Sequence, residues 1–129
     1  MRELLIQNAD KIAQLTDKPI GRYCAGLGAK DASKPITVAS VQSIARANVE
    51  PFSAIIVDEA HRVPHSRAGQ YHAVFAKSPN AKIIGLTATP FRLDGGMLTE
   101  GDDRLFDELA YEAKTGNLIA DGWLSPIVG

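Results

Sequence analysis

The chain has 129 residues, of which 45% are hydrophobic and 22% are charged. This length suits a single domain with one core, and the apolar content excludes a disordered chain. Fourteen basic and fifteen acidic residues give a net charge of −1, which excludes a polycation, so any contact with nucleic acid must come from a local surface.

The cysteine content and the length of the apolar runs narrow the class of protein further. Cys24 is the single cysteine, so the chain holds no internal disulfide, and we interpret this residue as part of the core. The longest apolar runs, such as residues 54–57, are far too short to span a bilayer, and the N-terminus has no signal-peptide pattern. We therefore expect a soluble, cytoplasmic domain, or a piece of one, without membrane contact.

The first half of the chain predicts helix, strand, strand and helix. Residues 2–15 favour a helix with Leu5, Ile12 and Leu15 on one stripe. Residues 21–26 form a strand candidate, which is followed by a glycine-containing loop. Residues 36–41 are β-branched and predict a second strand, and a short helix follows it over 42–47.

The second half continues this alternation. Residues 53–58 and 82–86 are continuous apolar runs, a pattern typical of strands that are covered on both faces in a parallel sheet. A helix is expected between them over residues 66–77. Further helices are expected over 102–109, which opens with a good N-cap residue, and over 117–121.

Alternating strands and helices predict the fold class. The pattern indicates one α/β domain over residues 1–129, with a mainly parallel sheet and helices on both faces. A loop around Gly95 and a last strand from Leu124 complete the expected elements. In such sheets the chemistry lies beyond the carboxyl ends of the strands, which here means the residues after 53–58 and 82–86.

The first of these strand ends carries Asp58-Glu59-Ala60-His61. An acidic residue that emerges from a buried strand can hold Mg²⁺ through its water shell, because this ion prefers oxygen ligands and few protein contacts. A second carboxylate can deprotonate the water that attacks a γ-phosphate. The alternative is a solvated acidic pair at a turn.

The second strand end carries Thr87-Ala88-Thr89-Pro90. Its hydroxyls can bond to His61 on the neighbouring strand end, or to the Mg²⁺ and phosphate shell. Threonine is also simply a good strand residue, which is the alternative interpretation. Because both motifs occur at successive strand ends, the pair favours a functional site.

Together the motifs resemble those of a known family. Asp58-Glu59-Ala60-His61 and Thr87-Ala88-Thr89 are similar to motifs II and III of superfamily 2 helicases of the DEAH/DExH type. Residues 2–8 resemble the second half of motif Ia, and residues 37–43 resemble motif Ib. The resemblance covers essentially the whole chain and is strongest to the RadD-like and type III restriction-enzyme helicase-subunit group.

This resemblance implies a RecA-like fold and an ATP-dependent DNA helicase or translocase that uses ATP and Mg²⁺. Asp58 would then coordinate Mg²⁺, and Glu59 would be the catalytic base. Coupling of hydrolysis to movement on DNA is implied for His61, Thr87, Ala88 and Thr89.

Contacts with the nucleic-acid backbone are implied for residues of motifs Ia and Ib, namely Arg2, Gln7, Ser40, Gln42 and Ser43. Hydroxyl, amide and guanidinium donors suit phosphates, whose recognition needs no base reading. The alternatives are a solvated helix face for Arg2 and Gln7, and a strand end with a helix cap for residues 40–43.

No segment of the 129 residues has the glycine-rich loop ending in Gly-Lys-Ser/Thr that cradles phosphates in P-loop ATPases. Residues 26–30 have the wrong spacing and predict a turn. We therefore expect a partial first RecA-like domain, with motif I and the second RecA-like domain in the parent protein, and little activity from the chain alone. The alternative is a non-catalytic remnant that serves as a nucleic-acid or protein interaction module.

The resemblance also leads to a prediction of self-association, and the sequence weighs against a rival metal site. In the family the P-loop strand lies beside the motif III strand, so residues 82–86 are expected to form an uncovered edge that self-associates. Gly85 would allow close packing of a helix. A metal site of Asp58 with the three histidines is disfavoured because Pro64 interrupts the helix that would align two of them.

Overall fold

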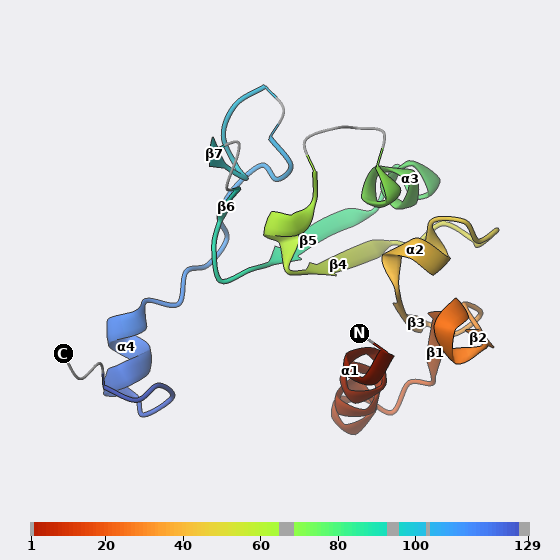
Figure 1. Ribbon diagram of the computed structural model, residues 1–129, viewed down its shortest axis with the longest axis horizontal. Coiled ribbons are helices and arrows are strands. Elements are labelled where there is room, and N and C mark those ends of the chain that lie inside the picture. Colours follow the sequence, from red (N-terminus) through yellow and green to blue (C-terminus); the bar gives the residue numbers. More distant parts are fainter. Residues whose placement is uncertain (1, 65–68, 93–95, 103, 127–129) are drawn as a thin grey trace.

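The computed structural model describes residues 2–64, 69–92, 96–102 and 104–126, and it shows a mixed α/β chain with three small sheets (Figure 1). Its strands are β1 (Ile20–Cys24), β2 (Ala29–Lys30), β3 (Ile36–Ala39), β4 (Ala54–Asp58), β5 (Lys82–Leu86), β6 (Phe91–Arg92) and β7 (Gly96–Met97). Its α-helices are α1 (Arg2–Leu15), α2 (Val41–Ile44), α3 (Gln70–Lys77) and α4 (Thr115–Ala120), and its 3₁₀ turns are η1 (Ala25–Leu27) and η2 (Ala60–Arg62).

The two longest strand pairings are parallel, as expected from the sequence. β1 pairs in parallel with β3, and β4 pairs in parallel with β5, with Ile55 opposite Ile83. The short strands β2 and β7, which were not predicted, pair antiparallel with β1 and β6. Within the described part of the chain β3 and β4 belong to separate sheets, so a single continuous sheet is not formed.

Helix α1 packs against β1 and β3 through one stripe of its surface. Leu5 and Ala9 are buried on this stripe, and an ion pair between Arg22 and Asp10 ties β1 to the helix. The predicted stripe was wrong at its end, because Leu15 is 86% exposed. The last turn of α1 therefore projects beyond the sheet that it covers.

Among the described residues, side chains cover one face of the β4–β5 pair and leave the other exposed, so the prediction of two covered faces was wrong. Side chains alternate along a strand, and those of Ile55 and Ile83 point toward α3 and the turn after β4. On the opposite face Ile56, Ile84 and Leu86 are 65%, 47% and 53% exposed. The continuous apolar run arises because both sides of the strands are apolar, although only one is packed.

Helix α3 also holds α2 in place. Val74 of α3 packs with Ile44 and Ala47 in a small buried cluster. The Lys77 ammonium donates hydrogen bonds to the carbonyl oxygens of Ile44 and Ala45, at 3.2 and 2.7 Å, and to that of Ala47. Because the last carbonyls of a helix have no partner within it, this lysine caps the carboxyl end of α2.

The segment after β7 is not the helix that was predicted over residues 102–109. Among its described residues, the Leu105 and Phe106 amides both donate to the Leu98 carbonyl, at 2.9 and 3.1 Å. Leu98 is 2% exposed, and Leu105 and Phe106 pack beside it. Burial of these apolar side chains outweighs local helix propensity here.

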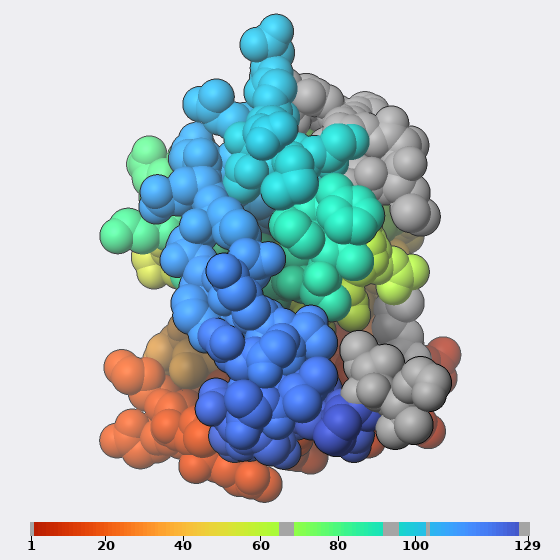
Figure 2. All heavy atoms as spheres, turned by 90° about the vertical axis from the view of Figure 1, so that its left-hand side faces the viewer, coloured from red at the N-terminus to blue at the C-terminus, as the bar shows by residue number. Residues whose placement is uncertain are grey.

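Beyond this packed segment, residues 107–114 are exposed and lead to α4, which stands apart from the sheets in Figure 1. Figure 2 shows the same C-terminal segment, in blue, extending along one side of the molecule. Gly122 closes α4 as predicted, with a φ of 78°, but residues 124–126 form no strand, and residues 127–129 lie outside the described ones. None of the described helices is long and apolar enough to cross a membrane.

Candidate functional site

The acidic pair lies where the sequence placed it, directly after the apolar run of β4. The side chains of Asp58 and Glu59 are both exposed, and Asp58 Oδ1 accepts a hydrogen bond of 3.0 Å from the Glu59 amide. Glu59 has φ 53° and ψ 50°, the one positive φ among the described residues other than glycine. Left-handed backbone costs such a residue about 1 kcal/mol, and strain of this kind is concentrated at functional sites.

This left-handed residue turns the chain sharply into η2. Ala60 becomes fully buried at 0% exposure, while the carboxylates on either side of the turn stay in solvent. Val63, 1% exposed, anchors the far end of η2 in the same core. The buried side chains of Ala60 and Val63 therefore anchor the backbone that carries the two exposed carboxylates.

The ends of β4 and β5 are joined by one side-chain hydrogen bond. His61 Nδ1 lies 2.9 Å from Thr87 Oγ1 and 3.4 Å from Glu59 Oε2. The Thr87 hydroxyl donates its single proton to the Thr89 carbonyl, at 2.9 Å, and accepts the Thr89 amide at 3.1 Å. His61 Nδ1 therefore lies within reach of both the Thr87 hydroxyl and the Glu59 carboxylate, and links the two strand ends.

The two adjacent carboxylates suit Mg²⁺ better than a zinc-type site. Among the described residues no three His, Cys, Asp or Glu side chains gather as a metal cluster. Mg²⁺ keeps several waters and takes only one or two carboxylates, so Asp58 and Glu59 fit it. The rival metal site is not formed by its described residues, since His72 bonds the Pro64 carbonyl and packs edge-on against Phe75, while His65 lies outside the described residues.

Most of the predicted nucleic-acid contacts gather at the carboxyl ends of β1 and β3. Ser43 Oγ accepts hydrogen bonds of 2.9 Å from both the Ala25 amide and the Ser40 hydroxyl. Arg2 lies against the same turn, because a Cβ built at Gly26 would come within 2.8 Å of Arg2 Nε. Ser40 directly follows β3 and is the N-cap residue of α2 in an extended conformation, although its side chain makes no cap hydrogen bond.

Gln7 is exposed on α1, five positions beyond Arg2, and therefore occupies a different face of that helix. No contact among the described residues brings Gln7 close to Ser40 and Ser43. Gln42, by contrast, is exposed at the start of α2, beside Ser43.

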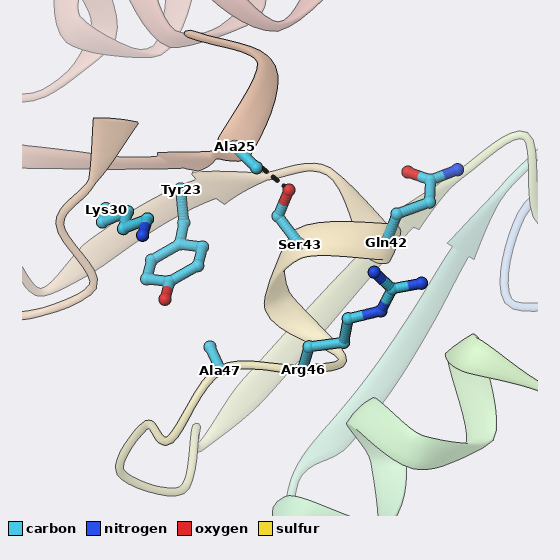
Figure 3. A pocket seen from close by; sticks show the side chains of 7 residues that line it. All are labelled: Tyr23, Ala25, Lys30, Gln42, Ser43, Arg46 and Ala47. Carbon is cyan, nitrogen blue, oxygen red and sulfur yellow. Dashed lines mark hydrogen bonds between the residues drawn. The ribbon is translucent and has the colours of Figure 1, made fainter. Parts of the chain in front are cut away.

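A cavity of about 310 Å³ opens beside these residues (Figure 3). Tyr23 and Lys30 approach it from the β1–β2 side, whereas α2 and the turn after it contribute the other polar side chains. The lining residues are Tyr23, Ala25, Lys30, Gln42, Ser43, Arg46 and Ala47. Two cations thus flank the predicted contacts.

Lys30 and Arg46 were missed by sequence reasoning. Both are exposed, and neither forms an ion pair with any residue that the structure describes. Arg46 follows Gln42 by four positions, a helical spacing that was a usable signal. Lys30 was interpreted as part of a turn, because its place on the short strand β2 depends on pairing with β1.

Two other residues can be compared with their predicted roles. Cys24 is buried at 7% exposure, which confirms its core role. Gly85 does allow close packing, but its neighbour is the Phe106 ring rather than a helix. Phe106 had no signal in the local sequence, since its contact is distant along the chain.

Comparisons with known proteins agree with these observations. Residues 1–92 match the family described as type III restriction enzyme, res subunit. The chain is also 33% identical over 113 residues to irc3 of Schizosaccharomyces pombe, which is assigned as a mitochondrial ATP-dependent helicase. This match covers 81% of the chain but 17% of the relative, so the chain spans about a sixth of that protein.

The family match covers more than half of the 129 residues, and it includes the acidic pair, His61 and Thr87. The chain belongs to the type III restriction enzyme res subunit family of helicases.

Proposed function

We propose that the chain supplies catalytic and DNA-contacting parts of an ATP-dependent DNA helicase or translocase with a RecA-like motor. One observation carries this proposal: the 2.9 Å hydrogen bond between His61 and Thr87, which joins the acidic strand end to its neighbour. Membership of a helicase family supports ATP as the substrate.

Each strand-end residue has a defined task in this proposal. The Glu59 carboxylate takes the proton from the water that attacks the γ-phosphate. Asp58 would hold Mg²⁺, which would supply positive charge to neutralise the phosphate oxygens. His61 connects Glu59 to Thr87, so a change at either strand end is transmitted to the other, with Ala88 and Thr89 completing the second end.

DNA would run along the surface formed by Arg2, Ser40, Gln42 and Ser43. Lys30 and Arg46, which have no ion-pair partner among the described residues, add two positive charges to this surface, and charge neutralisation dominates affinity for a phosphate backbone. Gln7 would contact the backbone farther along α1. We also propose the cytoplasm as the compartment, because the single cysteine is a buried thiol.

The activity test compares Glu59→Gln with Glu112→Gln, a change at an exposed glutamate away from the strand ends. In the natural protein that carries these residues, DNA-stimulated phosphate release is expected to fall about 100-fold or more in Glu59→Gln and to persist in the control. Stimulation by RNA alone would reassign the substrate. DNA binding by the wild type without turnover would favour a non-catalytic interaction module instead.

The 129 residues alone are expected to show little or no turnover, because they contain no Gly-Lys-Ser/Thr loop. Robust ATP hydrolysis by the purified chain, lost in Glu59→Gln, would contradict this expectation. The parent's P-loop segment and second RecA-like domain are the proposed partners that complete the motor.

A further inference from the structure

One aromatic ring from outside the motifs contacts both strand ends. Phe106 fills a notch at Gly85 of β5, where an added Cβ would meet the ring's Cζ and would lie 2.8 Å from its Cε2. The same Cβ would lie 2.9 Å from the Ala60 methyl group. The ring, the strand and the turn after β4 therefore meet at a single point.

The ring is held in this notch by its own backbone. The Phe106 amide donates to the Leu98 carbonyl at 3.1 Å, and the Leu98 amide donates to the Pro90 carbonyl at 2.9 Å. Leu98 is 2% exposed within the core cluster that also contains Ala60. A tightly packed group of this kind resists displacement, because protein interiors have few voids into which a side chain can move.

The notch lies next to the residues that join the two motifs. Ala60 immediately precedes His61, and Gly85 stands two positions before Thr87. A shift of the turn against β5 would therefore change the 2.9 Å separation of His61 Nδ1 and Thr87 Oγ1. Hydrogen bonds weaken steeply as the distance and angle depart from their optimum.

We propose that Phe106 is a positioning residue that sets the spacing between the two strand ends and so keeps His61 bonded to Thr87. Its effect on turnover rests on the proposed function, whereas its effect on the geometry does not. Phe106 itself touches neither ATP nor DNA in this proposal.

The geometry is tested by nuclear magnetic resonance on the 129-residue chain, through the Overhauser contact between the His61 ring and the Thr87 methyl group. Phe106→Ala is expected to abolish this contact. Leu105→Ala is the matched control, because Leu105 packs on the same cluster but is not among the atoms at the Gly85 notch. It should retain the contact.

A smaller change covers the case in which Phe106→Ala fails to fold. Phe106→Leu keeps an apolar side chain beside Gly85 but removes the ring, and it is expected to weaken the contact. An unchanged contact in folded Phe106→Ala would overturn the proposal. An unchanged contact in Phe106→Leu would overturn it as well.

The consequence for catalysis is measured in the natural protein that carries these residues. Phe106→Leu is expected to lower kcat for DNA-stimulated ATP hydrolysis about tenfold and to leave KM for ATP within about twofold, because small misplacement of catalytic groups is costly. An equal fall in Leu105→Ala would contradict a positioning role. If Glu59→Gln remained active, the proposed function would fail, and the resonance experiment would still decide the role of Phe106.

Discussion

The two faces of the β4–β5 pair are made of similar residues but differ in packing. On the inner face Val57 is 6% exposed, and Ala60 and Val63 beyond the strand are 0% and 1% exposed. On the outer face Ile56 and Ile84 are 65% and 47% exposed. Hydrophobic sequence alone therefore does not decide which face is buried; the elements supplied by the rest of the chain do.

This difference in packing explains where the positions of the site residues can be held precisely. The acidic turn and Thr87 stand above the packed inner face, where η2, α3 and the segment around Leu98 fix the backbone. Sites need such support, because catalytic geometry tolerates little displacement. The outer face offers apolar area for contact through Ile56, Ile84 and Leu86, which have no role in the proposed chemistry.

The largest expected difference between the faces is in stability. Leu98→Ala is expected to lower the free energy of unfolding by about 3 kcal/mol, because it leaves a cavity in the packed cluster. Ile84→Ala on the outer face is expected to cost less than about 0.5 kcal/mol. Urea unfolding followed by circular dichroism measures both values, and equal losses would refute the one-sided core.

The link between α2 and α3 should be the next most sensitive feature. Lys77→Met removes the ammonium that caps three carbonyl groups and is expected to cost about 2 kcal/mol. Lys82→Met, a change at an exposed lysine of β5, is the matched control and should be nearly neutral. An unchanged free energy of unfolding in Lys77→Met would show that the cap does not stabilise the fold.

Association should depend on the outer face and edge of β5. Among the described residues β5 pairs with β4 alone, and we expect a second copy to associate there. Light scattering at high concentration should detect oligomers of the wild type and fewer of them in Ile84→Lys. Leu15→Lys changes an exposed apolar residue of α1 and should not alter association. A monomeric wild type would rule out this edge as an interface.

The smallest expected effect is at Asp31, in the loop after β2. Hydrogen bonds from the Ser33 hydroxyl, at 2.7 Å, and from its amide, at 3.0 Å, hold the pKa of Asp31 below its ordinary value of 3.8. A carboxyl group whose folded-state pKa is lowered stabilises the fold above its unfolded pKa and loses this effect as the pH falls through the folded value. Asp31→Asn should therefore be slightly less stable than the wild type at neutral pH, and the difference should vanish in acid. A difference that persists in acid would point to another cause.

The sequence predicted those parts of the fold that depend on neighbouring residues. The apolar runs ending at Asp58 and before Thr87, and the helix α1, were all located because their patterns are local. The hairpin of β6 and β7, the cation at Lys30 and the role of Phe106 could not be found in this way. Each depends on contacts between residues far apart in the chain, which local propensity does not encode.

The central claim is that His61 and Thr87 act as one unit in ATP-driven movement on DNA. A double-mutant cycle of His61→Ala and Thr87→Val, scored by DNA-stimulated ATP turnover in the natural protein, tests it most directly. Each single change is expected to lower kcat about tenfold, and the double variant should be no slower than the slower single variant. Losses that multiply, or single variants with unchanged turnover, would contradict the claim.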